Sequence, residues 1–106
     1  MSISERYRAL VEGVEEVSAA LQAEPLEGSQ KHVSLVAKAL EGLDEFRESV
    51  GEIPQMHLEN KLSPVLLRAH SDLDRSRLLL DERGEEDRAA RIWELEQGIY
   101  RLLNSL

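Results

Sequence analysis

Apolar positions are densest between residues 31 and 50, where they form two adjacent stripes at helical spacing. A surface helix needs only one such stripe. Two stripes predict a central helix that touches neighbours on both sides, with Leu40 fully buried. Ser29 is the expected N-cap of this helix, and Gly51 and Pro54 follow its expected end. The stripes are Val36, Leu40, Leu43 and Val50 on one line, and Leu35, Ala39 and Phe46 on the other.

The first 24 residues carry a narrower apolar seam, in which the spacing alternates between four and three residues. This heptad-like spacing is typical of a bundle helix. Ser2 and Glu5 have the spacing of a capping box at the start, and Pro25 prevents the helix from continuing. The seam consists of Ile3, Tyr7, Leu10, Val14, Val17 and Leu21.

The second half of the chain contains two further apolar seams. Ser63 followed by Pro64 favours a helix start, and residues 55–62 can form a loop with one helical turn. One seam runs to Leu80, and the next apolar set, from Ala89 onwards, is about 120° out of phase with it. A turn at Gly84 explains this jump, whereas a single kinked helix across 64–105 is the alternative.

Four amphipathic segments with short connections predict an all-α protein, an antiparallel up-and-down four-helix bundle. The expected helices span about 4–24, 30–50, 64–82 and 85–105. A chain of 106 residues has the length of a single domain, residues 1–106. Only four residues are aromatic, so the core must be mainly aliphatic, which favours helices over strands.

Composition narrows the classes of function. The net charge of −8 argues against nucleic-acid partners and against binding to an anionic membrane surface. The absence of cysteine excludes disulfides, and no apolar run approaches the ~18 residues of a membrane span. The N-terminus shows no signal-peptide pattern, so we expect an intracellular, cytoplasmic protein. Residues 1–53 have a charge balance of −6 and residues 54–106 a balance of −2.

Two patterns of chemical groups point to enzyme families. Glu15–Glu16, followed by Glu41-x-x-Asp44, resembles the all-α nucleoside-triphosphate pyrophosphohydrolases. Those enzymes carry Glu-Glu-x-x-Glu on one helix and Glu-x-x-Asp on the next, and this resemblance implies a Mg²⁺ site of carboxylate oxygens. The third acid of the first motif is replaced here by Ala19, and a solvated acidic face accounts for the same residues.

His70 resembles the phosphorylated histidine of histidine phosphotransfer domains, which are four-helix units of about this length. The family places Lys-Gly and small residues after the histidine, whereas this chain has Ser71, Asp72 and Asp74 nearby. His70 and Asp74 also share a helix face at the i, i+4 spacing, but two side chains do not make a metal site. We therefore assign no catalytic, metal-binding or cofactor-binding residue.

Several apolar side chains of the last two segments fall outside the main seams and predict a partly open face. Such a face usually marks a binding surface for another protein or for a second copy. We therefore expect a non-enzymatic protein-interaction module that forms a homodimer, similar in size, charge and helicity to the small acidic chaperones and adaptors of bacterial export systems. The expected partner-binding residues are Leu78, Leu79, Trp93, Tyr100 and Leu103; Leu67 also lies off the seams.

Overall fold

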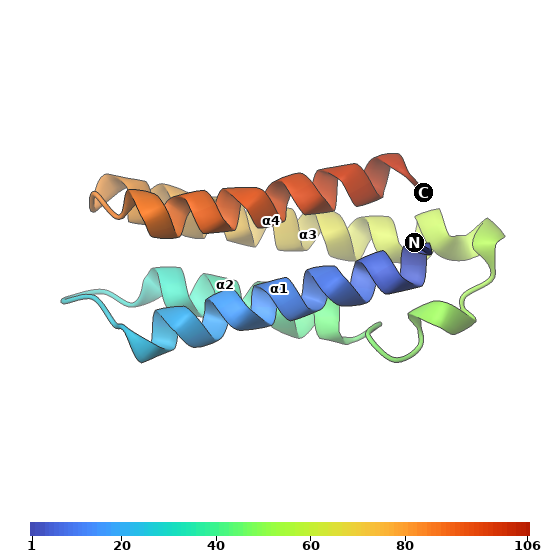
Figure 1. The fold of residues 1–106 in the computed structure, drawn as a ribbon, viewed down its shortest axis with the longest axis horizontal. Helices are drawn as coiled ribbons and strands as arrows, with labels where there is room; N and C mark the ends of the chain where they lie inside the picture. Colours follow the sequence, from blue (N-terminus) through green and yellow to red (C-terminus); the bar gives the residue numbers. More distant parts are fainter.

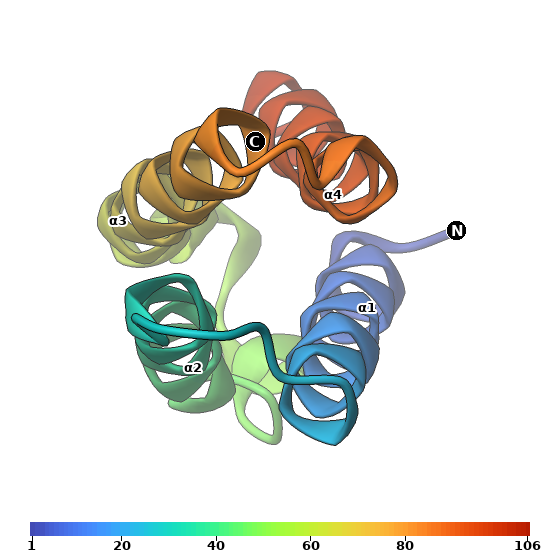
Figure 2. The ribbon, with the colours of Figure 1, turned by 90° about the vertical axis from the view of Figure 1, so that its left-hand side faces the viewer.

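The computed structural model describes all residues from 1 to 106 and shows an all-α, antiparallel four-helix bundle (Figure 1). Seen end-on, the helices follow one another around a square, so that α1 contacts both α2 and α4 (Figure 2). No strand is present. This arrangement confirms the predicted fold class. The helices are α1 (Ile3–Ala23), α2 (Lys31–Asp44), α3 (Gln55–Glu82) and α4 (Glu86–Asn104), with the 3₁₀ helix η1 (Val50–Glu52) between α2 and α3.

Helix α1 has the start predicted for it. The Ser2 hydroxyl accepts the Glu5 amide at 3.1 Å, and the Glu5 carboxylate accepts the Ser2 amide at 3.4 Å, which completes a capping box. All members of its apolar seam are buried except the half-buried Ile3. The buried Tyr7 hydroxyl donates to the Leu43 carbonyl and thereby fixes α1 against the end of α2. Burial raises the pKa of Tyr7.

Helix α2 is shorter than predicted, because it ends at Asp44 and not near residue 50. Arg8 explains the early end: its Nε donates to the Arg47 carbonyl at 2.8 Å and its Nη2 to the Glu48 carbonyl at 3.2 Å. These bonds satisfy carbonyls of the turn that follows the helix. Leu40 is only half-buried, so its predicted full burial was wrong, and the N-cap is Gln30 instead of Ser29.

Helix α3 begins at Gln55, about two and a half turns before the predicted start at Pro64. Leu58 and Leu62 pack against the core and stabilise these extra turns. Pro64 lies inside the helix, at an exposed position. Its ring removes one backbone donor, and water can satisfy the carbonyl left free there, so the helix continues through the proline.

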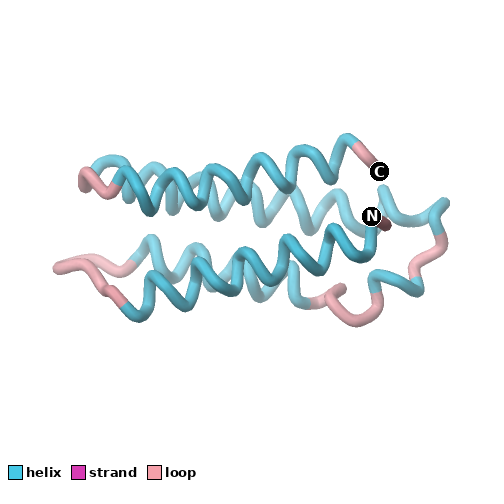
Figure 3. The backbone as a smooth tube through the Cα atoms, viewed as in Figure 1, coloured by secondary structure: helices cyan, strands magenta, loops and turns pink.

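The predicted turn at Gly84 is confirmed, and residues 64–105 therefore form parts of two helices. Gly84 has φ of +75°, a conformation that favours glycine. Arg83 extends from this turn to the α1–α2 loop, where it donates to the carbonyls of Ser29, at 2.8 Å, and Glu27. The α1–α2 loop and the α3–α4 turn lie at the same end of the bundle (Figure 3), and the hydrogen bonds of Arg83 join them.

The core runs along the bundle axis and is mainly aliphatic, as predicted. All four helices contribute, and the core includes Leu43, Leu73 and Ile99, each without measurable exposure. None of the helices combines the length and the apolar character needed to cross a lipid bilayer.

Candidate functional site

The exposed large apolar side chains are concentrated on helices α3 and α4. Apart from Met1 at the terminus, all of them belong to these two helices, with Met56 in the first turn of α3. Helices α1 and α2 have none. This uneven distribution identifies the outer side of the α3–α4 pair as the candidate functional site. Beyond the first turn of α3, four such residues remain: Leu67 (58% exposed), Leu78 (48%), Trp93 (51%) and Tyr100 (58%).

Helical spacing aligns these four residues as one pair on each helix, and we call the outer side of α3 and α4 that carries both pairs the α3–α4 face. Trp93 and Tyr100 are seven residues apart on α4 and share one side of that helix. Trp93 borders a groove of about 250 Å³ whose far wall is Arg77 and Asp81 of α3. Leu67 and Leu78 are eleven residues apart and share one side of α3, where Leu78 also lines a groove beside Leu35 of α2. The face therefore combines an aromatic line from α4 with an aliphatic line from α3.

The five residues predicted to bind a partner do not all lie together. Trp93, Tyr100 and Leu78 are on the α3–α4 face, with Leu78 at its edge. Leu79 is half-buried and, together with Leu78, lines a groove beside Leu35 of α2. Leu103 is half-buried against the core near the C-terminus. Whether any of the five binds a partner remains a prediction.

A buried charged cluster lies at the α3–α4 contact, at the inner edge of this face. Glu96 is only 3% exposed, although it is an ionisable residue. Its Oε1 lies 3.5 Å from Nε2 of His70, and its Oε2 lies 3.3 Å from Nε of Arg77. Glu96 follows Trp93 by three residues and precedes Tyr100 by four, so the two exposed aromatic residues flank it on the helix surface.

The two acids of this cluster have opposite pKa shifts. The pKa of Glu96 is raised to about 7, first by burial and then by its hydrogen bond to Asp74 and the charge of that carboxylate, whereas Arg77 opposes the shift. The pKa of Asp74 is lowered, chiefly because Arg77 donates to its Oδ1 from Nη2 at 2.8 Å and from Nε at 3.1 Å. Arg77 therefore pairs chiefly with Asp74 and keeps that carboxylate ionised. Glu96 can remain neutral because it shares a proton with Asp74.

Glu96 was not identified from the sequence, although a signal was present. It lies four residues after Ile92 and three before Ile99, and both of these are completely buried. This position is therefore on the buried side of α4. The pairing with His70 could not be predicted, because it depends on the register of α4 against α3.

The acidic residues that resemble the pyrophosphohydrolase motif are held by an arginine. Glu15 of α1 and Asp44 of α2 both approach Arg47, at 3.2 and 3.3 Å respectively. The guanidinium thus occupies the position between the two carboxylates where a bridging cation would lie. No three or more acidic or histidine side chains of the structure form a group suited to a metal ion.

The histidines occupy different environments. His70 is partly exposed beside Glu96, and His57 is exposed near the start of α3. His32 is buried at the start of α2, and its Nε2 has no hydrogen-bond partner. Burial, with the nearby charges of Arg83 and Arg88, lowers the pKa of His32. His70 therefore has a partly exposed side chain beside a buried acid.

Comparisons with known proteins identify no relative. No protein-family model matches the chain, and searches of curated proteins and of solved structures give no match either.

Proposed function

We propose that this protein is a non-enzymatic interaction module, of the adaptor or chaperone-like kind, which binds other proteins through the α3–α4 face. The observation that carries the proposal is the restriction of exposed large apolar residues to α3 and α4, Met1 apart. Half-exposed tryptophan and tyrosine side chains of this kind are enriched where proteins bind one another, because each supplies a large contact area at small entropic cost.

A second copy of the chain is the partner that we propose for this face. Two-fold symmetry buries the same apolar residues twice, which makes it the commonest arrangement for soluble oligomers. The charge distribution favours this choice of face. Residues 1–53, which form α1, α2 and η1, have a balance of −6, while the α3–α4 half has a balance of −2. A dimer formed through the α3–α4 face keeps the two acidic halves apart and limits repulsion between the copies.

Molar mass measured by light scattering after size exclusion tests this proposal at tens of micromolar protein. We expect the parent chain to be a dimer and a variant with Trp93→Ala and Tyr100→Ala to be a folded monomer. Loss of a central interface aromatic costs about 2 kcal/mol or more, which weakens association roughly 30-fold.

Gln22→Ala is the control, since Gln22 is also a long exposed side chain but lies on α1, outside the face. This control should remain dimeric. A monomeric parent, or a double variant that is as dimeric as the parent, would overturn the proposal. Unchanged helical circular dichroism in the double variant would show that the effect is not caused by unfolding.

A further inference from the structure

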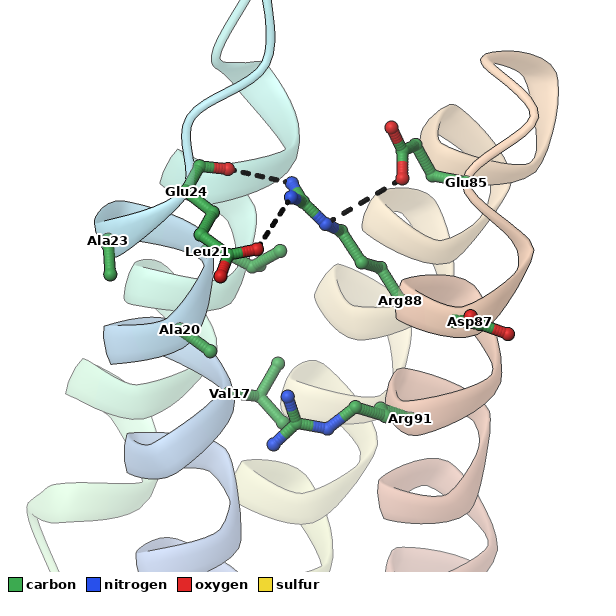
Figure 4. A pocket seen from close by; sticks show the side chains of 9 residues that line it. All are labelled: Val17, Ala20, Leu21, Ala23, Glu24, Glu85, Asp87, Arg88 and Arg91. Atoms are coloured by element: carbon green, nitrogen blue, oxygen red, sulfur yellow. Dashed lines mark hydrogen bonds and ion pairs between the residues drawn. The ribbon is translucent and has the colours of Figure 1, made fainter.

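A separate cavity lies on the opposite flank of α4, between the last turns of α1 and the first turns of α4 (Figure 4). Its volume is about 370 Å³, which is within the range of small-molecule sites. The α1 side supplies an apolar floor, and the α4 side supplies charged walls. The lining residues are Val17, Ala20, Leu21, Ala23 and Glu24 from the end of α1, and Glu85, Asp87, Arg88 and Arg91 from the start of α4.

Arg88 forms a fixed side of this cavity. Its Nη1 donates to the Glu24 carbonyl at 2.8 Å, and its Nη2 lies 3.4 Å from the Glu24 carboxylate. Its Nε lies 3.7 Å from the Glu85 carboxylate. Two of the three acids in the lining are therefore paired with Arg88. These contacts connect the ends of α1 and α4, so the cavity has a defined shape before any ligand enters.

Arg91, in contrast, has no ion-pair or hydrogen-bond partner among the lining residues, and its guanidinium points across the cavity toward Val17 (Figure 4). Asp87, the third acid of the lining, extends away from Arg91 in the same view. The first turn of α4 adds the positive end of a helix dipole to this wall. A free guanidinium above a floor of buried Val17 and Leu21 therefore forms an amphipathic site.

We propose that this cavity binds a small organic anion, a monocarboxylate with a short hydrocarbon chain. The carboxylate would pair with Arg91, whose planar guanidinium suits two parallel hydrogen bonds to a carboxylate. The hydrocarbon chain would lie on Val17, Ala20 and Leu21. A bare inorganic anion would leave that apolar floor uncovered, and an ammonium group would meet Arg91 with the same charge.

This site is independent of the proposed protein-binding face. Arg91 and Trp93 are two positions apart on α4, which places their side chains about 200° apart around the helix axis. A ligand in the cavity and a second copy on the α3–α4 face can therefore be present together, and either function can fail without the other.

Octanoate is the probe for this proposal, followed by backbone amide NMR of the whole chain below the micellar concentration of the probe. We expect saturable shifts confined to the amides of residues 17–24 and 85–91. Octanol has the same chain without the charge, and we expect it to bind at least about tenfold more weakly.

Two variants and one control locate the site. Arg91→Gln removes the anion partner and should weaken octanoate binding by about tenfold or more. Ala20→Leu fills the space above the floor and should weaken both probes. Arg75→Gln, an equal change of charge at an exposed position of α3, should leave binding unchanged. Shifts that do not saturate, equal binding of octanol and octanoate, or an unaltered affinity in Arg91→Gln would overturn the proposal.

Discussion

Replacement of Glu96 by glutamine should stabilise the protein at alkaline pH, because the folded state disfavours the ionised carboxylate. The pKa of Glu96 is about 7 in the folded chain, against 4.5 for an unperturbed glutamate. Below about pH 4.5 both states hold the proton, and this group leaves stability unchanged. As the pH rises from about 4.5 to 7, the unfolded state releases its proton first, so stability is lost across this window.

The size of the effect follows from the pKa difference. Each pKa unit corresponds to about 1.4 kcal/mol, so ionised Glu96 costs about 3 kcal/mol at pH ~8 and less than about 1 kcal/mol at pH ~5. Glutamine has nearly the same shape, and its amide can donate to Asp74 as the protonated carboxyl does. Arg77 keeps its two hydrogen bonds to Asp74 and its contact with Asp81 in the variant. The stability that Glu96→Gln gains at pH ~8 should therefore approach the full cost of ionising Glu96, about 3 kcal/mol.

Urea denaturation followed by helical circular dichroism, at pH ~5 and pH ~8, measures this gain. We expect Glu96→Gln to exceed the parent by about 3 kcal/mol at the higher pH and by less than about 1 kcal/mol at the lower. Glu94→Gln, the same change at an exposed position of α4, should have little effect at either pH. A variant that is less stable than the parent at pH ~8 would show that Glu96 is ionised and that its pairing with Arg77 outweighs burial.

Three further changes test other parts of the fold by the same denaturation assay. Tyr7→Phe should lower the free energy of unfolding by about 1–3 kcal/mol, since the Leu43 carbonyl loses its buried donor; no loss would show that this bond is not formed. Gly42→Ala should stabilise the protein by about 0.5–1 kcal/mol, because a Cβ added there meets nothing within 4 Å. Gly84→Ala should destabilise the protein, because Gly84 has φ of +75°. Effects of equal sign in the two variants would contradict the assigned turn at Gly84. His32 has a lowered pKa, so its contribution to stability is present above about pH 6.5 and is lost as the pH falls. His32→Leu should therefore lose less stability than the parent between pH ~7 and pH ~5. Equal losses in the two proteins would refute the burial of His32.

The helical architecture could be predicted because its signals are local. The capping box at Ser2, the seam of α1 and the phase change at Gly84 all depend on residues near one another in the chain, and the structure has each of them. The two wrong boundaries depend on distant contacts. Arg8 of α1 holds the turn after α2, and burial of Leu62 carries α3 through Pro64.

Only part of the candidate site could be predicted from the sequence. The exposed positions of Trp93 and Tyr100 follow from their phase relative to Ile92 and Ile99. Their relation to Leu67 and to the buried Glu96 depends on the register of α4 against α3, which no local pattern specifies. The cavity beside Arg91 likewise depends on how the ends of α1 and α4 meet.

The fluorescence of Trp93, measured as a function of protein concentration, is the most direct test of the α3–α4 face. Trp93 is the only tryptophan of the chain and is half-exposed in the single bundle, so its emission reports whether this face is covered. From well below to well above micromolar concentration, we predict that the emission shifts to shorter wavelength and becomes less accessible to acrylamide. Gln22→Ala, on α1, should show the same transition as the parent. Emission and quenching that stay those of a half-exposed tryptophan at every concentration would contradict self-association through this face.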